Sequence, residues 1–270
     1  MKVTFLGGGN MGAAIVGGLV ARGFAPADIT VIEPGEGARQ ALAARFGVAV
    51  REAAGPGLAR ADALVLAVKP QQMRGAVKAL LPLDPATVAV TIAAGIRIAD
   101  LSRWLGGHAA IVRAMPNTPA LVHAGVAGLF APPAVSAEQR GRAEALLGAV
   151  GEVVWLPREE DLDAVTAVSG SGPAYVFYFI EALERAGIEM GLAPAAARAL
   201  AIGTFQGAAK LARERGEDPA LLRAQVTSKG GTTERALAEM EGAALKARFI
   251  EAVKAARARS RELGEESGRD

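Results

Sequence analysis

The chain contains no cysteine and only two histidines, His108 and His123, among its 270 residues. The absence of cysteine excludes disulfides, thiolate catalysis and cysteine-ligated metals. The two histidines do not form HExxH or any similar spacing, so we predict no metal site and assign both to ordinary surface or core-edge positions.

Long hydrophobic runs and an excess of one charge are also missing. No apolar run reaches the roughly 20 residues that span a bilayer, and a strand predicted to begin at Lys2 leaves no room for a signal peptide. The chain has 30 basic and 28 acidic residues, with the arginines scattered, so no basic face for nucleic acid is predicted. We therefore expect a cytoplasmic protein that binds neither membranes nor nucleic acid.

Aromatic residues make up only 4% of the chain, whereas glycine and alanine are abundant. This composition favours closely packed helices over a β-sandwich. The length suits one large domain or two ordinary ones.

Short apolar segments alternate with helical segments through the first half of the chain. We predict strands at 2–6, 29–32, 63–68, 88–92 and 109–112, with helices at 10–22 and 36–46. The strand at 63–68 is fully apolar, which is typical of a parallel sheet covered on both faces. The pattern predicts an α/β, doubly wound, Rossmann-type domain. After residue 116 we expect a β-rich loop, a helix near 136–149 and a strand ending at Trp155.

Strand signals stop after the charge-dense linker Pro157–Asp161. We place the domain boundary there, with a dinucleotide-binding domain at 1–158 and an all-helical domain at 159–270. Predicted helices cover 162–187, 194–215, 218–224, 233–239 and 242–262. Their small, apolar residues suit close helix contacts, so we predict an oligomer interface. The polar segment 259–270 is expected to fray.

Gly7-x-Gly9-x-x-Gly12 lies between the first strand and the first helix, which is the context of the dinucleotide fingerprint. Gly7 permits the tight turn, Gly9 admits the pyrophosphate, and Gly12 lets the helix pack on the strand. A simple glycine-rich turn is the alternative.

Glu33 ends the second strand, about 20 residues after the fingerprint, where a carboxylate accepts hydrogen bonds from the ribose of NADH. Arg39 is close enough to contact the 2′-phosphate of NADPH, or else is a solvated helix residue. The choice between NADH and NADPH stays open.

Two further segments follow buried strands. Ala67-Val-Lys-Pro-Gln71 brings Lys69 and Gln71 to the edge of the sheet where such folds bind ligands. The prolines of Arg113-Ala-Met-Pro-Asn-Thr-Pro119 hold Asn117 in place. Each segment can also be read as a structural turn.

Glycines interrupt the helical segment Ala167–Phe177 at Gly170 and Gly172. Each costs about 1 kcal/mol relative to alanine in a helix interior. Close approach of a ligand or of another backbone accounts for this cost, and so does helix packing.

Val226–Thr233, with the sequence VTSKGGTT, gathers hydroxyl groups, a lysine and two glycines in eight residues. Such a segment aims hydroxyl and backbone donors at a small anion. The alternative is a loop before a helix that Ser228 or Thr232 caps.

Five motifs, in order, resemble those of the pyrroline-5-carboxylate reductases, which catalyse the last step of proline biosynthesis: GGGNMG, AVKPQ, RAMPNTP, SGSGPAYVF and VTSKGGTT. The resemblance covers essentially the whole chain. It implies a Rossmann domain followed by a helical dimerisation domain, a homodimer or higher homo-oligomer, and NADPH or NADH as cofactor.

The resemblance also implies residue roles. Thr233 is the catalytic residue, hydrogen-bonded to the ring nitrogen of the substrate. The substrate carboxylate is surrounded by Ser228, Gly230, Gly231 and Thr232. The cofactor-binding residues implied are Gly7, Gly9, Asn10, Met11, Gly12, Glu33, Ala67, Val68, Lys69, Pro70 and Asn117.

The implied reaction is hydride transfer from nicotinamide C4 to C5 of a cyclic imine, which needs little acid–base machinery. One alternative is a β-hydroxyacid dehydrogenase or a related imine reductase. Such dehydrogenases use a lysine on the interdomain helix, and residues 162–187 contain none. The other is a nucleotide-sensing regulator without turnover, which does not account for Val226–Thr233.

The chain departs from the family pattern at two positions. Lys229 replaces a proline found in many relatives, which frees the backbone and adds a charge that attracts an acid. Ala54 aligns with an asparagine that contacts the cofactor ribose, so that contact is expected to be missing.

Overall fold

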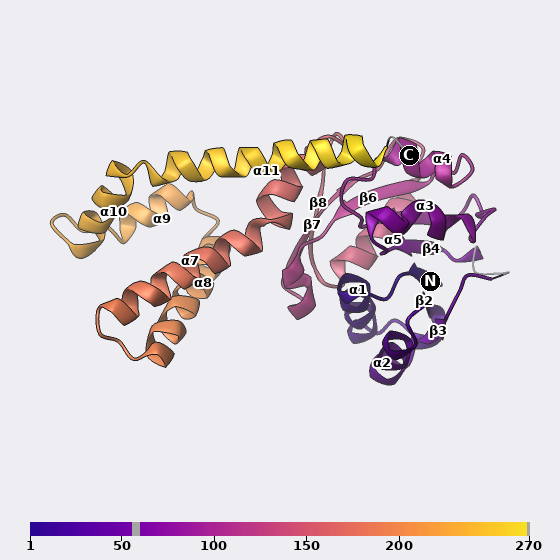
Figure 1. The fold of residues 1–270 in the computed structure, drawn as a ribbon, viewed down its shortest axis with the longest axis horizontal. Coiled ribbons are helices and arrows are strands. Elements are labelled where there is room, and N and C mark those ends of the chain that lie inside the picture. The colour runs from indigo at the N-terminus through magenta and orange to yellow at the C-terminus, as the bar shows by residue number, and fades with distance from the viewer. Residues whose placement is uncertain (56–59, 269–270) are drawn as a thin grey trace. The chain divides into compact units, whose positions relative to one another are not determined.

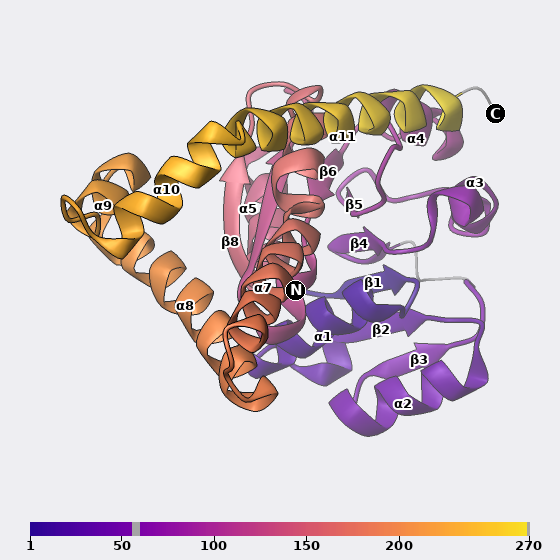
Figure 2. The same ribbon diagram turned by 60° about the vertical axis from the view of Figure 1, so that its left-hand side comes forward.

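The computed structural model describes residues 1–55 and 60–268. The chain divides into two compact units (Figures 1 and 2): unit 1 comprises Met1–Ser171 with Ala256–Asp270, and unit 2 comprises Gly172–Ala255. The predicted domain boundary after residue 158 stays a prediction.

Unit 1 is built around an eight-stranded sheet of order β3-β2-β1-β4-β5-β6-β7-β8. Neighbouring strands are parallel, except that β6 and β7 are antiparallel. The strands are β1 (Val3–Leu6), β2 (Ile29–Ile32), β3 (Ala49–Arg51), β4 (Ala63–Leu66), β5 (Val88–Thr91), β6 (Ile111–Met115), β7 (Gly125–Phe130) and β8 (Gly151–Trp155). The predicted doubly wound fold is confirmed.

Helices cover both faces of this sheet. One apolar cluster joins the sheet to α1, α2 and α5 through Ile15, Leu42 and Leu146. The other joins it to α3 and α4 through Met73 and Leu101. The helical elements are α1 (Asn10–Ala21), η1 (Pro26–Asp28), α2 (Glu36–Phe46), α3 (Pro70–Lys78), α4 (Ile98–Trp104), η3 (Thr118–Val122), α5 (Ala137–Gly148), α6 (Asp161–Val165) and η4 (Thr166–Gly170).

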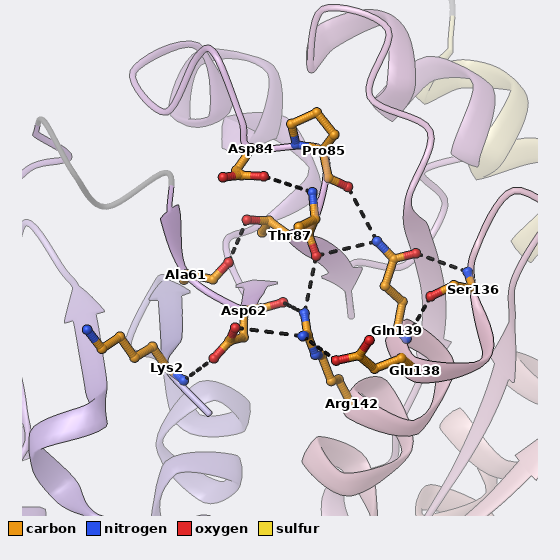
Figure 3. A network of polar contacts seen from close by, with 11 residues as sticks. Lys2, Ala61, Asp62, Asp84, Pro85, Thr87, Ser136, Glu138, Gln139 and Arg142 are labelled. Atoms are coloured by element: carbon orange, nitrogen blue, oxygen red, sulfur yellow. Dashed lines mark hydrogen bonds and ion pairs between the residues drawn. The ribbon is translucent and has the colours of Figure 1, made fainter.

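A polar network fixes the edge of the sheet where β1, β4 and β5 begin (Figure 3). Asp62 accepts a hydrogen bond from the backbone N–H of Lys2 at 2.7 Å. Arg142 of α5 donates to the carbonyls of Asp62 and Ala86, both at 3.2 Å, and pairs with Glu138 at 2.7 Å. These contacts tie α5 to the amino-terminal ends of the strands. The carboxyl-terminal ends are left to the loops that carry the predicted site.

Unit 2 consists of helices. They are α7 (Gly172–Glu189), α8 (Pro194–Arg215), α9 (Pro219–Gln225), α10 (Thr232–Gly242) and the first part of α11 (Leu245–Ser267). Small residues let α7 and α8 approach each other, since a Cβ added to Gly187 would lie 3.1 Å from Cβ of Ala197. Tyr175 and Phe179 of α7 each stack edge-on against Phe249 of α11, with centroids 5.6 Å apart.

The structure corrects the prediction of one continuous helix at 162–187. Residues Thr166–Gly170 form a π-helix, η4, between α6 and α7. A Cβ added to Gly170 would lie 2.6 Å from Cε of Met115. Gly170 therefore lets Met115 pack against the helix. The wider turn of η4 shifts the helical register within the SGSGPAYVF motif.

The predicted fraying of residues 259–270 is wrong for the residues that the structure describes. Helix α11 continues to Ser267, and both Ser260 and Gly264 are buried. The hydroxyl of Ser260 donates to Asp163 at 2.9 Å, and Gly264 faces Arg97. Small residues one helical turn apart make a narrow buried strip, which composition alone does not distinguish from a polar tail.

Within residues 1–55 and 60–268, no helix is both long and apolar enough to cross a membrane.

Candidate active site

The glycine turn after β1 has the shape that a dinucleotide needs. Gly7 adopts φ +102°, and a Cβ there would lie 2.7 Å from the carbonyl oxygen of Ala67. A Cβ on Gly12 would lie 2.7 Å from the carbonyl oxygen of Gly7. A Cβ on Gly9, in contrast, would meet no atom within 4 Å. Gly7 and Gly12 are therefore required by packing, while Gly9 leaves the turn open.

Helix α1 begins at Asn10 directly behind this turn. Its N-cap is Gly9, and no side chain caps it. The N–H groups of the first helical turn, including those of Met11 and Gly12, therefore suit an anion such as a pyrophosphate. The residues of unit 1 fit a dinucleotide at this position.

The segment after β4 lies against the glycine turn. The Ala67 carbonyl and the Val68 side chain are the nearest neighbours of the position that a Gly7 side chain would take. Lys69 is the N-cap of α3 and is exposed, and Pro70 is the first residue of that helix. The structure thus brings the fingerprint and the AVKPQ motif together.

Glu33, directly after β2, is held by the same turn. Its Oε2 accepts the backbone N–H of Gly8 at 2.9 Å, and its Oε1 accepts that of Gly35 at 3.0 Å. Arg39 turns towards the backbone, where its Nη1 donates to the carbonyls of Glu33 at 2.9 Å and Pro34 at 2.6 Å.

Asn117, two residues after β6, links two loops of unit 1. Its Oδ1 accepts the backbone N–H of Val126 at 2.9 Å, and its Nδ2 donates to the hydroxyl of Ser169 in η4 at 3.1 Å. The two motifs RAMPNTP and SGSGP therefore meet through these side chains. Sequence reasoning did not identify Ser169, although the glycines around it marked the segment.

Arg113, the first residue of the RAMPNTP motif, is also a residue that sequence reasoning missed. Its side chain is 4% exposed and pairs with Glu159 at 3.1 Å. Burial lowers the pKa of the Arg113 guanidinium, and the charge of Glu159 opposes this shift. Glu159 also accepts the backbone N–H of Ile98 at 2.9 Å. These contacts anchor β6, whose end carries Asn117.

The segment Val226–Thr233 of unit 2 forms the loop before α10. Gly230 has φ +73°, and Gly231 is the N-cap of α10 without a side-chain hydrogen bond. The alternative of a cap from Ser228 or Thr232 is therefore not what the structure contains. Thr232 and Thr233 are the first two residues of α10, where the helix dipole favours an anion.

Two of the backbone donors predicted for the carboxylate already have acceptors. The N–H of Gly230 donates to Oε2 of Glu234 at 2.6 Å, and that of Gly231 donates to the carbonyl of Ser228 at 3.0 Å. Thr227 donates its hydroxyl to the carbonyl of Arg223 at 2.6 Å. The loop thus presents the hydroxyl groups of Ser228, Thr232 and Thr233 and the exposed ammonium group of Lys229 as side-chain donors.

The two departures from the family pattern have ordinary surroundings. Lys229 is exposed. Ala54 packs against the apolar cluster beneath α3 and α4. Among the residues that the structure describes, no three His, Cys, Asp or Glu side chains are grouped as a metal site would require.

Two family models match the chain. Residues 159–263 match the pyrroline-5-carboxylate reductase dimerisation model, and residues 2–95 match the coenzyme F420-dependent NADP oxidoreductase model. These matches agree with the predicted order of a nucleotide-binding domain followed by a helical dimerisation domain.

Similarity to individual proteins extends over the whole chain. A pyrroline-5-carboxylate reductase from Pseudomonas aeruginosa is 45% identical, and the match covers 99% of this chain and 98% of that protein. The solved structure of a pyrroline-5-carboxylate reductase from Coxiella burnetii has a TM-score of 0.91 at 40% identity, covering 97% of this chain and 98% of that one.

A third structure is more distant in sequence. The pyrroline carboxylate reductase of Plasmodium falciparum, solved with NADP bound, has a TM-score of 0.85 at 27% identity and covers 98% of both chains. The resemblance drawn from the five motifs is confirmed, as is a nicotinamide cofactor, NADPH or NADH. Identity of 45% over nearly the full length of both proteins shows that this chain belongs to the pyrroline-5-carboxylate reductase family.

Proposed function

We propose that this enzyme reduces 1-pyrroline-5-carboxylate to L-proline with NADPH or NADH. The observation that carries the proposal is the start of α10, where two threonines stand at a helix N-terminus that has no side-chain cap. A small substrate with one carboxylate and one ring nitrogen matches this arrangement. The open glycine turn of unit 1 supplies the site for the cofactor. A cytoplasmic location stays a prediction.

Each group of residues then has a separate task. Gly7, Gly9 and the start of α1 hold the dinucleotide. Ser228 and Thr232 bind the carboxylate of the substrate. Thr233 orients the ring nitrogen, because a threonine hydroxyl both donates and accepts hydrogen bonds. When bound, the reduced nicotinamide supplies the hydride that the carbon of the C=N bond accepts.

Little acid–base chemistry is needed from the protein, because a protonated C=N bond is already electrophilic. The residues contribute chiefly by holding the reacting groups in the right orientation, which accelerates a reaction by lowering its entropic cost. This agrees with a substrate loop whose side-chain donors are hydroxyl groups and one lysine, Lys229.

We also propose that unit 2 forms the contact of a homo-oligomer. Of its residues only Gly187, Ala197 and Ala201 are buried within one chain. The side chains of Phe177 and Tyr178 are 64% and 69% exposed, and Met190 is 77% exposed. Apolar surface of this extent is typical of a protein–protein interface.

The reaction is tested by following NADH and NADPH absorbance after addition of pyrroline-5-carboxylate, with proline measured as product. Rapid loss of absorbance and formation of proline are expected. A β-hydroxyacid dehydrogenase would instead turn over a hydroxy acid. A nucleotide-sensing regulator would bind the dinucleotide without turnover.

The role of Thr233 is tested by Thr233→Ala. We expect kcat to fall about ten- to a hundredfold, as for one lost hydrogen bond to a charged group, with the Kd for the cofactor unchanged. Thr227→Ala is the matched control, because its hydroxyl is already bonded to the carbonyl of Arg223. Unchanged steady-state kinetics in Thr233→Ala would contradict the assignment.

A further inference from the structure

The carboxylate of Glu33 is fixed at the nucleotide-binding edge of the sheet. It follows β2, the strand beside β1, and its two oxygens accept one backbone N–H each, from Gly8 and Gly35. One of these donors belongs to the glycine turn itself. The position of the negative charge is therefore set by the same loop that binds the dinucleotide.

This carboxylate retains capacity for a ligand. An ionised carboxylate accepts about four hydrogen bonds and donates none, and two of the four are used by Gly8 and Gly35. The 2′- and 3′-hydroxyls of an adenosine ribose are donors that suit the remaining lone pairs. A 2′-phosphate is an acceptor with negative charge, so it would be repelled by the same group.

Arg39, one of whose two interpretations is a contact with a 2′-phosphate, uses part of its guanidinium elsewhere. Arg39 is 17% exposed at its side chain, and its Nη1 donates to the carbonyls of Glu33 and Pro34. Its Nη2 lies 3.7 Å from the carboxylate of Glu52. Both N–H groups of Nη1 are thus used by the loop that positions Glu33, which leaves Nη2 and Nε as the donors for a phosphate.

The other charged groups near this edge do not favour the 2′-phosphate of NADPH. Arg51, the last residue of β3, is exposed, and its backbone lies beside that of Ile32 in the sheet. Glu52 follows it, and Glu36 opens α2. The charged residues of these segments are thus three carboxylates, of Glu33, Glu36 and Glu52, and two guanidinium groups, of which that of Arg39 donates to the backbone.

We propose that this enzyme prefers NADH to NADPH, and that Glu33 is the residue that selects between them. The proposal deepens the proposed function by naming the cofactor. It rests on the nucleotide site of unit 1 and needs no knowledge of the substrate.

The test is equilibrium binding of NADH and of NADPH to the full chain, without substrate, measured by the fluorescence of the nicotinamide. We expect NADPH to bind at least about tenfold more weakly, a factor that corresponds to about 1.4 kcal/mol. In Glu33→Gln this ratio is expected to fall by about tenfold, because the charge is removed while an amide oxygen can still accept a backbone N–H. Glu36→Gln removes a neighbouring charge as a matched control and should leave the ratio unchanged.

Three results would overturn the proposal. One is equal or tighter binding of NADPH by the unaltered enzyme. Another is an equal loss of affinity for both cofactors in Glu33→Gln, which would assign Glu33 to loop structure alone. The third is a selective loss of NADPH affinity in Arg51→Ala, which would assign a 2′-phosphate contact to Arg51.

Thermal unfolding of Glu33→Gln verifies that it is folded, and Glu33→Ser is measured in its place if it is not. Because no substrate is present, an error in the proposed reaction would leave these binding ratios unaffected. Conversely, an enzyme that reduces pyrroline-5-carboxylate but binds NADPH more tightly would refute only the cofactor preference.

Discussion

Glu234 places a carboxylate on the backbone N–H of Gly230, at the start of α10. The substrate carboxylate would also accept hydrogen bonds from backbone N–H groups at this end of α10. A fixed negative charge therefore lies beside the proposed anion site. The VTSKGGTT motif does not reveal this contact, since Glu234 follows the motif and its contact depends on a side-chain conformation.

At this residue we predict that Glu234→Gln lowers KM for pyrroline-5-carboxylate about two- to fivefold, the range that corresponds to about 0.3–1 kcal/mol for a charge near a helix end. The kcat should change little, because the loop keeps an acceptor for Gly230. Initial-rate kinetics provide the measurement. Glu239→Gln, on the same helix and paired with Arg235, is the control. A higher KM in Glu234→Gln would mean that its charge supports the loop more than it opposes the substrate.

At the scale of elements, the end of α11 is part of unit 1 through a buried polar contact. Asp163 of α6 is 6% exposed at its side chain and pairs with Arg97 at 3.0 Å. It also accepts the hydroxyl of Ser260 at 2.9 Å. One carboxylate therefore satisfies partners from two other segments, so its removal leaves both without an acceptor.

We predict that Asp163→Ala lowers the free energy of unfolding of unit 1 by about 3 kcal/mol, as for the breaking of a buried ion pair. Amide exchange in residues 256–267 should become faster, because α11 loses its polar anchor. Denaturant unfolding and hydrogen exchange measure the two effects. Glu265→Ala alters an exposed pair on the same helix and should leave both nearly unchanged. Equal exchange rates in the two variants would show that apolar packing alone holds α11.

Some elements could be predicted because one local pattern determines them. The strands β1, β4 and β5 are apolar except for one threonine each in β1 and β5, and they are buried at every position. The helix at 194–215 was predicted with the bounds that α8 has. The short strand β3 and the end of α11 could not be predicted, because distant segments stabilise them.

The site shows the same difference between local and distant effects. The glycine fingerprint indicated a turn because Gly7 needs a positive φ. The positions of Glu33 and Asn117 in the sequence indicated cofactor contacts, but their hydrogen bonds were not predictable, and Glu234 was not identified from the sequence at all. The contacts of Glu33 with Gly8 and of Asn117 with Ser169 join segments that only the folded chain brings together. The roles of these residues in binding therefore stay predictions.

At the scale of the whole molecule, unit 2 exposes apolar side chains along its helices. A second copy that covers these side chains would remove them from water, and the burial of apolar surface drives association. We predict that Phe177→Glu shifts the oligomer towards monomers, since a charge would be buried without a partner.

Sedimentation velocity over a range of protein concentrations measures this shift. Val154→Glu is the control, because Val154 is an exposed apolar residue of unit 1, 48% exposed. That variant should sediment as the unaltered protein does. An unchanged oligomer in Phe177→Glu would exclude this part of α7 from the interface.

The chain leaves unit 1 after Ser171 and returns to it at Ala256, so unit 2 is an insertion attached at both ends. A segment attached at both ends cannot be exchanged between copies unless one attachment is released. Here the release would require residues 256–267 to separate from Arg97 and Asp163. The buried contact of Ser260 must therefore break before any such exchange, which slows domain swapping.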